Sequence, residues 1–150
     1  MEGPVPTVED VTQKVQRILA KNFSVRLGGD GGYFLDRGST TCKVSCQQFG
    51  PAEAESVLVL LETPILYEVP ITDELCRWIA IEGRRTFGQY ALHPLDESEK
   101  EGNLWFDHAL LGDTIDTGEL CLTASLMLAS ADHEDDQLQE RFGGKRLREE

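Results

Sequence analysis

The sequence is short of basic residues, with 14 lysines and arginines against 27 aspartates and glutamates, and its formal net charge is −13. A field of this sign repels phosphate backbones and anionic lipid headgroups, so we expect binding neither to nucleic acid nor to membrane surfaces. No apolar run approaches the roughly 20 residues that a membrane-spanning helix needs. The start, Met1-Glu2-Gly3-Pro4, lacks the basic residues and apolar run of a signal peptide. These absences predict a soluble, cytoplasmic protein.

Aromatic residues are also few, at 7%, but hydrophobic residues make up 40% of the chain. That share is ordinary for a globular protein and too high for a disordered one. The 150 residues have room for one compact domain and none for a second. We expect a single domain over residues 1–150, with a short disordered N-terminus over about 1–6 and a charged C-terminal tail over about 145–150.

The four cysteines are Cys42, Cys46, Cys76 and Cys121. They lie inside apolar segments and their spacing matches no recognised disulfide scaffold, so reduced thiols that fill the core are favoured over two disulfides. Cys42 and Cys46 share one face of a predicted strand but lie about 13 Å apart. They cannot hold a zinc ion jointly without a bend in that strand.

Changes in hydrophobic period divide the chain into helices and strands. Each of the three predicted helices begins at a capping residue followed by an acid, at Thr7, Thr72 and Asp116. The predicted elements are, in order, a helix over 7–22, strands over 24–27, 33–35, 40–47 and 56–61, a helix over 72–83, strands over 89–93 and 104–108, and a helix over 116–142. Strands and helices do not alternate throughout. We therefore predict an α+β fold, an antiparallel β-sheet with flanking helices in the order α-β-β-β(-β)-α-β-β-α.

Two neighbouring segments in the middle of the chain carry further expectations. The run from Ser56 to Leu61 is apolar at consecutive positions, which is typical of a central strand covered on both faces. Covering the second face requires another layer of this chain or a partner molecule, and self-association is one way to supply it. The next segment, Thr63–Pro70, contains two prolines, which exclude a helix and a central strand. We expect an extended connection there.

The residues that could perform chemistry form no recognised catalytic pattern. The sequence has no Gly-x-Ser-x-Gly elbow, P-loop or metalloprotease helix. His108 falls beside apolar residues and is interpreted as a structural histidine. The acidic run Asp132–Asp136 points around a helix and cannot converge on one metal ion. We predict no catalytic residue, metal or cofactor, and an enzyme that depends on His108 or on the thiol of Cys121 is a remote alternative.

Several short motifs resemble those of a known bacterial family. They are residues 30–35 with Gly38-Ser39, residues 69–75, Phe87-Gly88, residues 106–120 and residues 131–144. With these motifs the chain resembles the YbjN and type III secretion chaperone-like proteins, especially the actinobacterial peptide-binding chaperone-like branch. The resemblance implies a helix-flanked antiparallel sheet, frequent dimerisation, and capture of a segment of another protein without nucleotide or metal.

We therefore predict a non-enzymatic, chaperone-like protein that binds a peptide or segment of another protein, its client. Tyr67, on the proline-flanked segment, and Trp105, which faces away from Phe106, are the candidate partner-binding residues. The alternative is a regulatory or scaffolding subunit that acts through a homodimer. In that case Trp78, on the second predicted helix, is the candidate for the dimer interface.

Overall fold

The computed structural model describes residues 6–29, 31–51 and 55–146, and it confirms the predicted α+β fold and the order of its elements. Its elements are α1 (Val8–Asn22), β1 (Val25–Leu27), β2 (Tyr33–Arg37), β3 (Thr40–Phe49), β4 (Ser56–Pro70), α2 (Asp73–Glu82), β5 (Gln89–Pro94), β6 (Glu101–Leu111) and α3 (Thr117–Phe142). Most of the expected disordered start and charged tail lie outside the described residues, as does Asp30, the first residue of the motif over residues 30–35. Across the described ranges, no helix is both long enough and apolar enough to cross a membrane.

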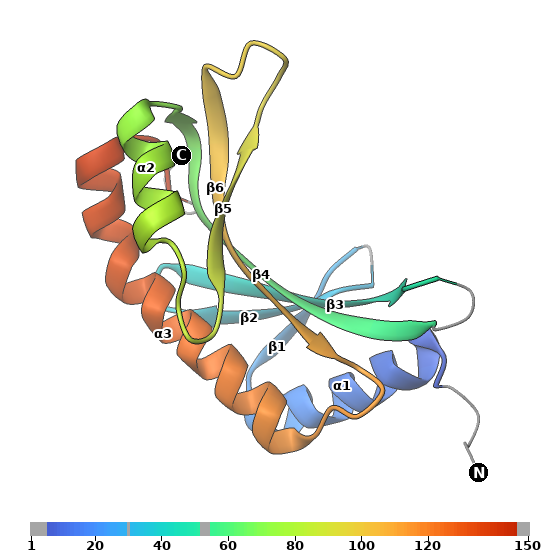
Figure 1. The fold of residues 1–150 in the computed structure, drawn as a ribbon. Helices are drawn as coiled ribbons and strands as arrows, with labels where there is room; N and C mark the ends of the chain where they lie inside the picture. The colour runs from blue at the N-terminus through green and yellow to red at the C-terminus, as the bar shows by residue number, and fades with distance from the viewer. Residues whose placement is uncertain (1–5, 30, 52–54, 147–150) are drawn as a thin grey trace.

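The six strands form one antiparallel sheet in the order β1-β2-β3-β4-β6-β5. The first four strands follow one another along the sheet, and β6 then pairs with the other side of β4, which makes β5 an outer strand. Figure 1 shows α1 and α3 along one side of this sheet and α2 beside β5. The helices thus cover one face, and no helix or strand of the described chain covers the other.

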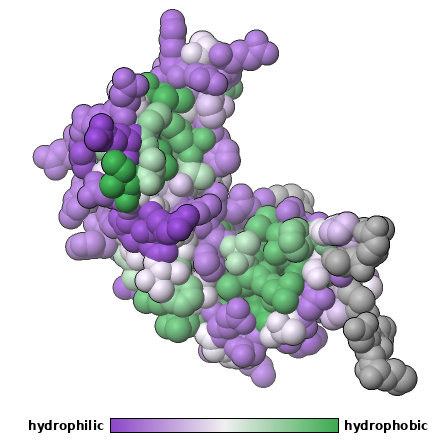
Figure 2. All heavy atoms as spheres, viewed as in Figure 1, coloured by the Kyte–Doolittle hydropathy of each residue, from purple (hydrophilic) through white to green (hydrophobic). Residues whose placement is uncertain are grey.

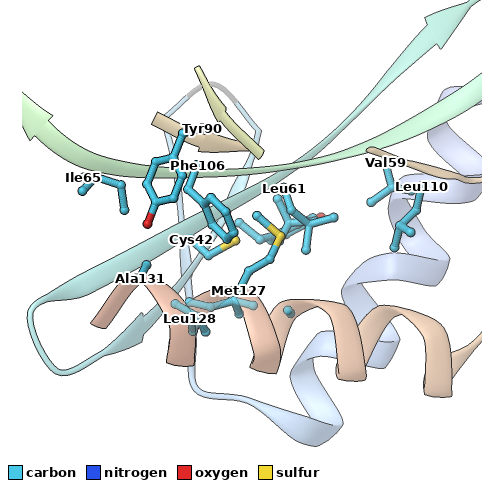
Figure 3. Close-up of a cluster of buried hydrophobic side chains, with 14 of the residues drawn as sticks. Cys42, Val59, Leu61, Ile65, Tyr90, Phe106, Leu110, Met127, Leu128 and Ala131 are labelled. Atoms are coloured by element: carbon cyan, nitrogen blue, oxygen red, sulfur yellow. The ribbon is translucent and has the colours of Figure 1, made fainter. Parts of the chain in front are cut away.

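The hydrophobic core lies between the sheet and the helices. Leu61 of β4, Phe106 of β6 and Met127 of α3 are fully buried and point toward one another (Figure 3). Along β4 the odd-numbered side chains from Val57 to Thr63 are buried while the residues between them are only half-buried. The period of two therefore directs one set of β4 side chains to the helices and the other set to the uncovered face.

The three predicted helix starts are confirmed by their caps. The Thr7 hydroxyl accepts a hydrogen bond from the backbone N–H of Asp10, and the Asp10 carboxylate accepts one from the backbone N–H of Thr7, a complete capping box. Thr72 and Asp116 each accept a hydrogen bond from the backbone N–H three residues further on. Local sequence chemistry is enough to set these three boundaries.

The expectation of an extended connection over Thr63–Pro70 was wrong. β4 continues through this segment and pairs with β6 to its end. Pro64 is tolerated because even-numbered β4 residues direct their backbone nitrogens toward β3, and the β3–β4 ladder has already ended at Glu62. The pairing with β6 changes register twice between Pro64 and Val69, so β4 remains paired with β6 through this segment despite its irregular backbone.

All four cysteines are free thiols in the described chain. Cys42 is buried as expected, and burial raises the pKa of its thiol to about 12. Cys46 and Cys121 are half-buried. The expectation of a core position was wrong for Cys76, because it lies on the outer side of α2 while Trp78 takes the inner side.

Candidate functional site

The face of the sheet opposite the helices, here called the open face, has apolar residues near one end. Leu58 and Leu60 of β4 lie beside Leu111 and Ala109 of β6 in the pairing register, and these four residues form the apolar patch. Leu111 is 44% exposed and Ala109 is also exposed. Figure 2 shows a hydrophobic area over this end of β4 and β6, at the lower right of the view. The second face of the central strand therefore lacks a covering layer from the described chain.

A row of charged and polar side chains crosses the open face next to the apolar patch. In register across four strands it runs Lys43, Glu62, Asp107 and Gln89. Glu62 and Asp107 are direct cross-strand partners, so their Cβ atoms are about 5 Å apart. Like charges in directly opposite positions destabilise a sheet, so this carboxylate pair opposes folding.

Asp107 is the most perturbed carboxylate of this row. Its pKa is raised to about 6, mainly by burial and also by the negative charge of Glu62, while the opposing effect of His93 of β5 lowers it. Its Oδ1 atom is buried and accepts no hydrogen bond from the described residues. Arg84 and Arg85 lie near it across a shared cavity. A partly desolvated carboxylate without a full set of hydrogen bonds costs folding free energy at neutral pH.

Asp107→Asn is therefore expected to raise the free energy of unfolding at pH 7 by about 1 kcal/mol, a value reduced by solvent screening at this partly exposed site. The pKa of Asp107 is about 6 in the folded protein and about 3.9 in the unfolded chain. The folded state therefore binds the proton more readily, and the ionised form destabilises it. The stabilisation by Asp107→Asn should shrink as pH falls from 6 and vanish below about 4, where Asp107 is protonated in both the folded and the unfolded state.

Urea unfolding at pH 7 and at pH 4 measures this difference. Glu97→Gln removes the same charge from an exposed loop and should change the unfolding free energy by less than about 0.5 kcal/mol at either pH. An equal stabilisation by Asp107→Asn at both pH values would contradict the assignment of the cost to the ionised carboxylate.

The apolar patch and the charged row meet at a cavity of about 530 Å³. One wall consists of sheet residues, among them Leu60, Asp107 and Ala109. The opposite wall is the turn between α2 and β5, which contributes Arg84 and Gly88. The cavity thus combines apolar surface with charged groups of both signs.

The turn between α2 and β5 is fixed to β6 by His108. The backbone N–H of Gly88 donates a hydrogen bond to His108 Nδ1 at 3.1 Å, and the Phe87 ring packs edge-on against the imidazole, with 5.9 Å between centroids. Burial lowers the pKa of His108, which favours the neutral ring that can accept at Nδ1. Two motifs on which the family resemblance was based, Phe87-Gly88 and residues 106–108, therefore meet at the cavity.

The backbone of β6 is unpaired on one side next to this cavity. β5 stops pairing with β6 at Asp107, whereas β4 pairs with it as far as Leu111. The Gly112 N–H donates to the Val57 carbonyl at 2.6 Å, so even-numbered residues at this end of β6 direct their backbone groups to β4 and odd-numbered residues to the opposite side. The N–H and C=O groups of Ala109 and Leu111 therefore point to the side on which β5 pairs with the earlier part of β6. No strand in the described ranges pairs with them, and we call this segment the free edge.

The structure brings together the two residues predicted to bind a partner. Tyr67 and Trp105 are both half-buried and contact edge-on, with 6.5 Å between ring centroids. Trp105 lies opposite Pro64 on the open face, on the far side of the charged row from the apolar patch. Contact of either residue with a client stays a prediction.

Trp78, the candidate for the dimer interface, lies in a different cluster. Its side chain is only 9% exposed and packs against Tyr90 and Phe142, with ring centroids 4.9 and 5.9 Å away. The Arg85 guanidinium lies over the indole at 5.8 Å. Little of the ring is left for a second subunit, and its role in a dimer stays a prediction.

Sequence reasoning missed the Glu62–Asp107 pair and the free edge. The alternation of residues 104–111 places Asp107 and Ala109 on the same side of a strand, which was the available signal. The sequence does not reveal that β6 pairs with β4 in the register that places Glu62 opposite Asp107.

A second polar cluster joins α3 to the β2–β3 turn. Asp132 accepts hydrogen bonds from the backbone N–H and the hydroxyl of Ser39, both at 3.3 Å, and Asp135 accepts the same hydroxyl at 2.5 Å. These contacts fix the turn to the helix, so the motif residues there serve the fold. Within the described part of the chain, no group of three histidines, cysteines or acids could hold a metal ion.

One family model matches residues 8–150, which include the sheet, the three helices and the cavity. It is described as T3SS (YopN, CesT) and YbjN peptide-binding chaperone 1, or TY-Chap1. No curated protein matches the chain.

Proposed function

Because this chain belongs to the TY-Chap1 family of peptide-binding chaperones, we propose that it binds an extended segment of another protein along the free edge of β6. The observation that carries the proposal is that the outward backbone groups of Ala109 and Leu111 pair with no strand of the described ranges, and that Ala109 lines the cavity. Extended peptides bind sheets by adding a strand to such an edge, where main-chain hydrogen bonds supply affinity. Alternate side chains of the added strand would cover the apolar patch.

The outer strands offer poorer edges for the same purpose. β1 is only three residues long, and its Arg26 is held in an ion pair with Asp36 at 2.6 Å. On β5, the Tyr90 N–H already donates to the Gly83 carbonyl at 2.8 Å. Short and charged edges discourage strand addition, so the free edge is favoured over both.

The arrangement at the cavity favours binding over a chemical reaction. The Nδ1 atom of His108 is occupied by the Gly88 N–H, and burial raises the pKa of the Cys121 thiol, which keeps the sulfur protonated. A nucleophile needs an adjacent base or a lowered pKa, and neither residue has that setting. We infer a role without turnover.

Ala109→Pro tests the proposed edge. The variant should weaken peptide binding at least tenfold, a loss of about 1.4 kcal/mol, because proline removes the backbone N–H that faces the free edge. Binding is measured by fluorescence anisotropy with labelled peptides of about twelve residues, taken as the tightest binders from a random extended library. Ala109→Ser keeps the N–H at the same exposed position and is the matched control.

A second measurement leaves the protein unchanged. N-methylation of alternate backbone nitrogens should abolish binding when the methylated set faces β6 and should be tolerated when it faces away. If the wild-type protein binds no peptide above background, the proposal fails. It also fails if Ala109→Pro and both N-methylated series bind as tightly as the originals.

A further inference from the structure

We propose that the segment bound at the free edge carries a lysine or arginine opposite Ala109, and that this side chain binds the Glu62–Asp107 pair. The inference rests on the proposed function, since it names the chemistry of the client at the same site. Its grounds are the position of the added residue, the room above Ala109, and the charges on the cavity walls.

The position follows from the geometry of an added strand. A residue directly opposite Ala109 would place its side chain on the same face of the sheet as the Ala109 methyl group, which is the open face. Its diagonal neighbours on β6 would be Asp107 and Leu111, about 7–8 Å away and within reach of a long side chain. The sheet thus sets a carboxylate on one side of this position and an apolar side chain on the other.

The small side chain of Ala109 leaves space above it for a long client side chain. A single methyl group lies at the floor of a cavity of about 530 Å³, and Leu60 lies beside it. The aliphatic stem of lysine or arginine can lie along such apolar surface while its charged end extends to a polar partner. A short side chain would leave most of this space to solvent.

The charges on the sheet side of the cavity favour a cation. Glu62 and Asp107 place two carboxylates at adjacent positions, and Lys43 supplies one positive charge on the far side of Glu62. Asp107 also has a buried Oδ1 that accepts no hydrogen bond from the described residues. An ammonium or guanidinium group at the accessible part of the pair would offset the repulsion between the carboxylates.

The arginines of the opposite wall do not fill this role. Arg85 is bound to Glu134, with 2.8 Å between Nη2 and Oε1, and its guanidinium lies over Trp78. Arg84 is exposed, and its backbone forms an isolated bridge with Gln89. Neither arginine makes a hydrogen bond or ion pair with Asp107 in the described structure. The net charge of −13 further favours a basic segment over an acidic one.

A substitution scan of one bound peptide tests the inference. The probe is the tightest library binder of about twelve residues, with lysine, arginine, norleucine or glutamate placed in turn at each position. At one position, lysine and arginine should bind about tenfold tighter than norleucine, and glutamate should bind most weakly. The preference should fall as the salt concentration rises from about 0.05 to 0.5 M.

Two isosteric variants then locate the effect on the protein. Glu62→Gln and Asp107→Asn should each reduce the preference for lysine over norleucine at that position severalfold, and the double variant should abolish it. Glu97→Gln removes the same charge from an exposed loop and should leave the preference unchanged. Norleucine peptides should bind the wild-type protein and all of these variants equally, which shows that the site remains folded.

The two proposals fail in different ways. If peptides bind but lysine has no advantage at any position, or if its advantage survives in the double variant, the basic-residue inference is overturned and strand addition stands. If no peptide binds the wild-type protein, both are overturned.

Discussion

Gly88→Ala should lower the free energy of unfolding by about 3 kcal/mol. Gly88 has a φ of +103°, a conformation that residues with a side chain rarely adopt. A Cβ atom there would lie 2.5 Å from Cζ of Phe106, whose ring is fully buried in the core. The ring has no free space to enter, so the turn, the core or both must shift. Urea unfolding monitored by circular dichroism measures the loss.

Two further variants show whether the contact with Phe106 causes the loss of stability in Gly88→Ala. Gly29→Ala adds a methyl group with nothing within 4 Å, so its effect should be below about 0.5 kcal/mol. Phe106→Leu removes the ring atoms that the new methyl group would strike. The combination of Gly88→Ala with Phe106→Leu should therefore cost at least about 1 kcal/mol less than the sum of the two single changes. Additive costs would show that the contact with Phe106 is not the source.

Trp78→Ala should also lower the free energy of unfolding by about 3 kcal/mol. The indole is 9% exposed and is packed between Tyr90 and Phe142, so its removal leaves a cavity where α2, β5 and α3 meet. The midpoint of urea unfolding measures the change. Ile81→Ala is the matched control on the same helix, because Ile81 is 68% exposed and its truncation should cost less than about 0.5 kcal/mol.

Sedimentation equilibrium on the same two variants separates the structural role of Trp78 from a role in self-association. If Trp78 acts within the fold, the folded fraction of Trp78→Ala should have the same mass as the wild-type protein. A variant that unfolds at the wild-type midpoint but changes from dimer to monomer would contradict the expected loss of stability. That result would favour the alternative of a regulatory or scaffolding subunit acting through a homodimer.

The parts of the fold that local chemistry determines were predictable from the sequence. Thr7, Thr72 and Asp116 mark helix starts because their side chains satisfy backbone donors a few residues away. Each of these caps depends only on residues within one helical turn of each other.

The parts that depend on long-range pairing were not predictable. The prolines of residues 63–70 argued against a central strand, yet Pro64 directs its nitrogen to a side where β3 no longer needs a donor. The pairing of Glu62 with Asp107 depends on the β4–β6 register, which no local pattern fixes. The candidate site depends on that register, so the sequence pointed to Tyr67 and Trp105 and missed the carboxylate pair.

The end of the described chain has a consequence for truncated forms of this protein. Tyr67 and Lys145 exchange two backbone hydrogen bonds, of 2.7 and 2.8 Å, beyond the point where β3 stops pairing with β4. A residue near the end of the described chain thus pairs with the part of β4 that β3 does not reach. Deleting the residues after Gly143 would leave a second template for intermolecular pairing, and such templates promote aggregation. Lys145 thus keeps this stretch of β4 from pairing with another molecule.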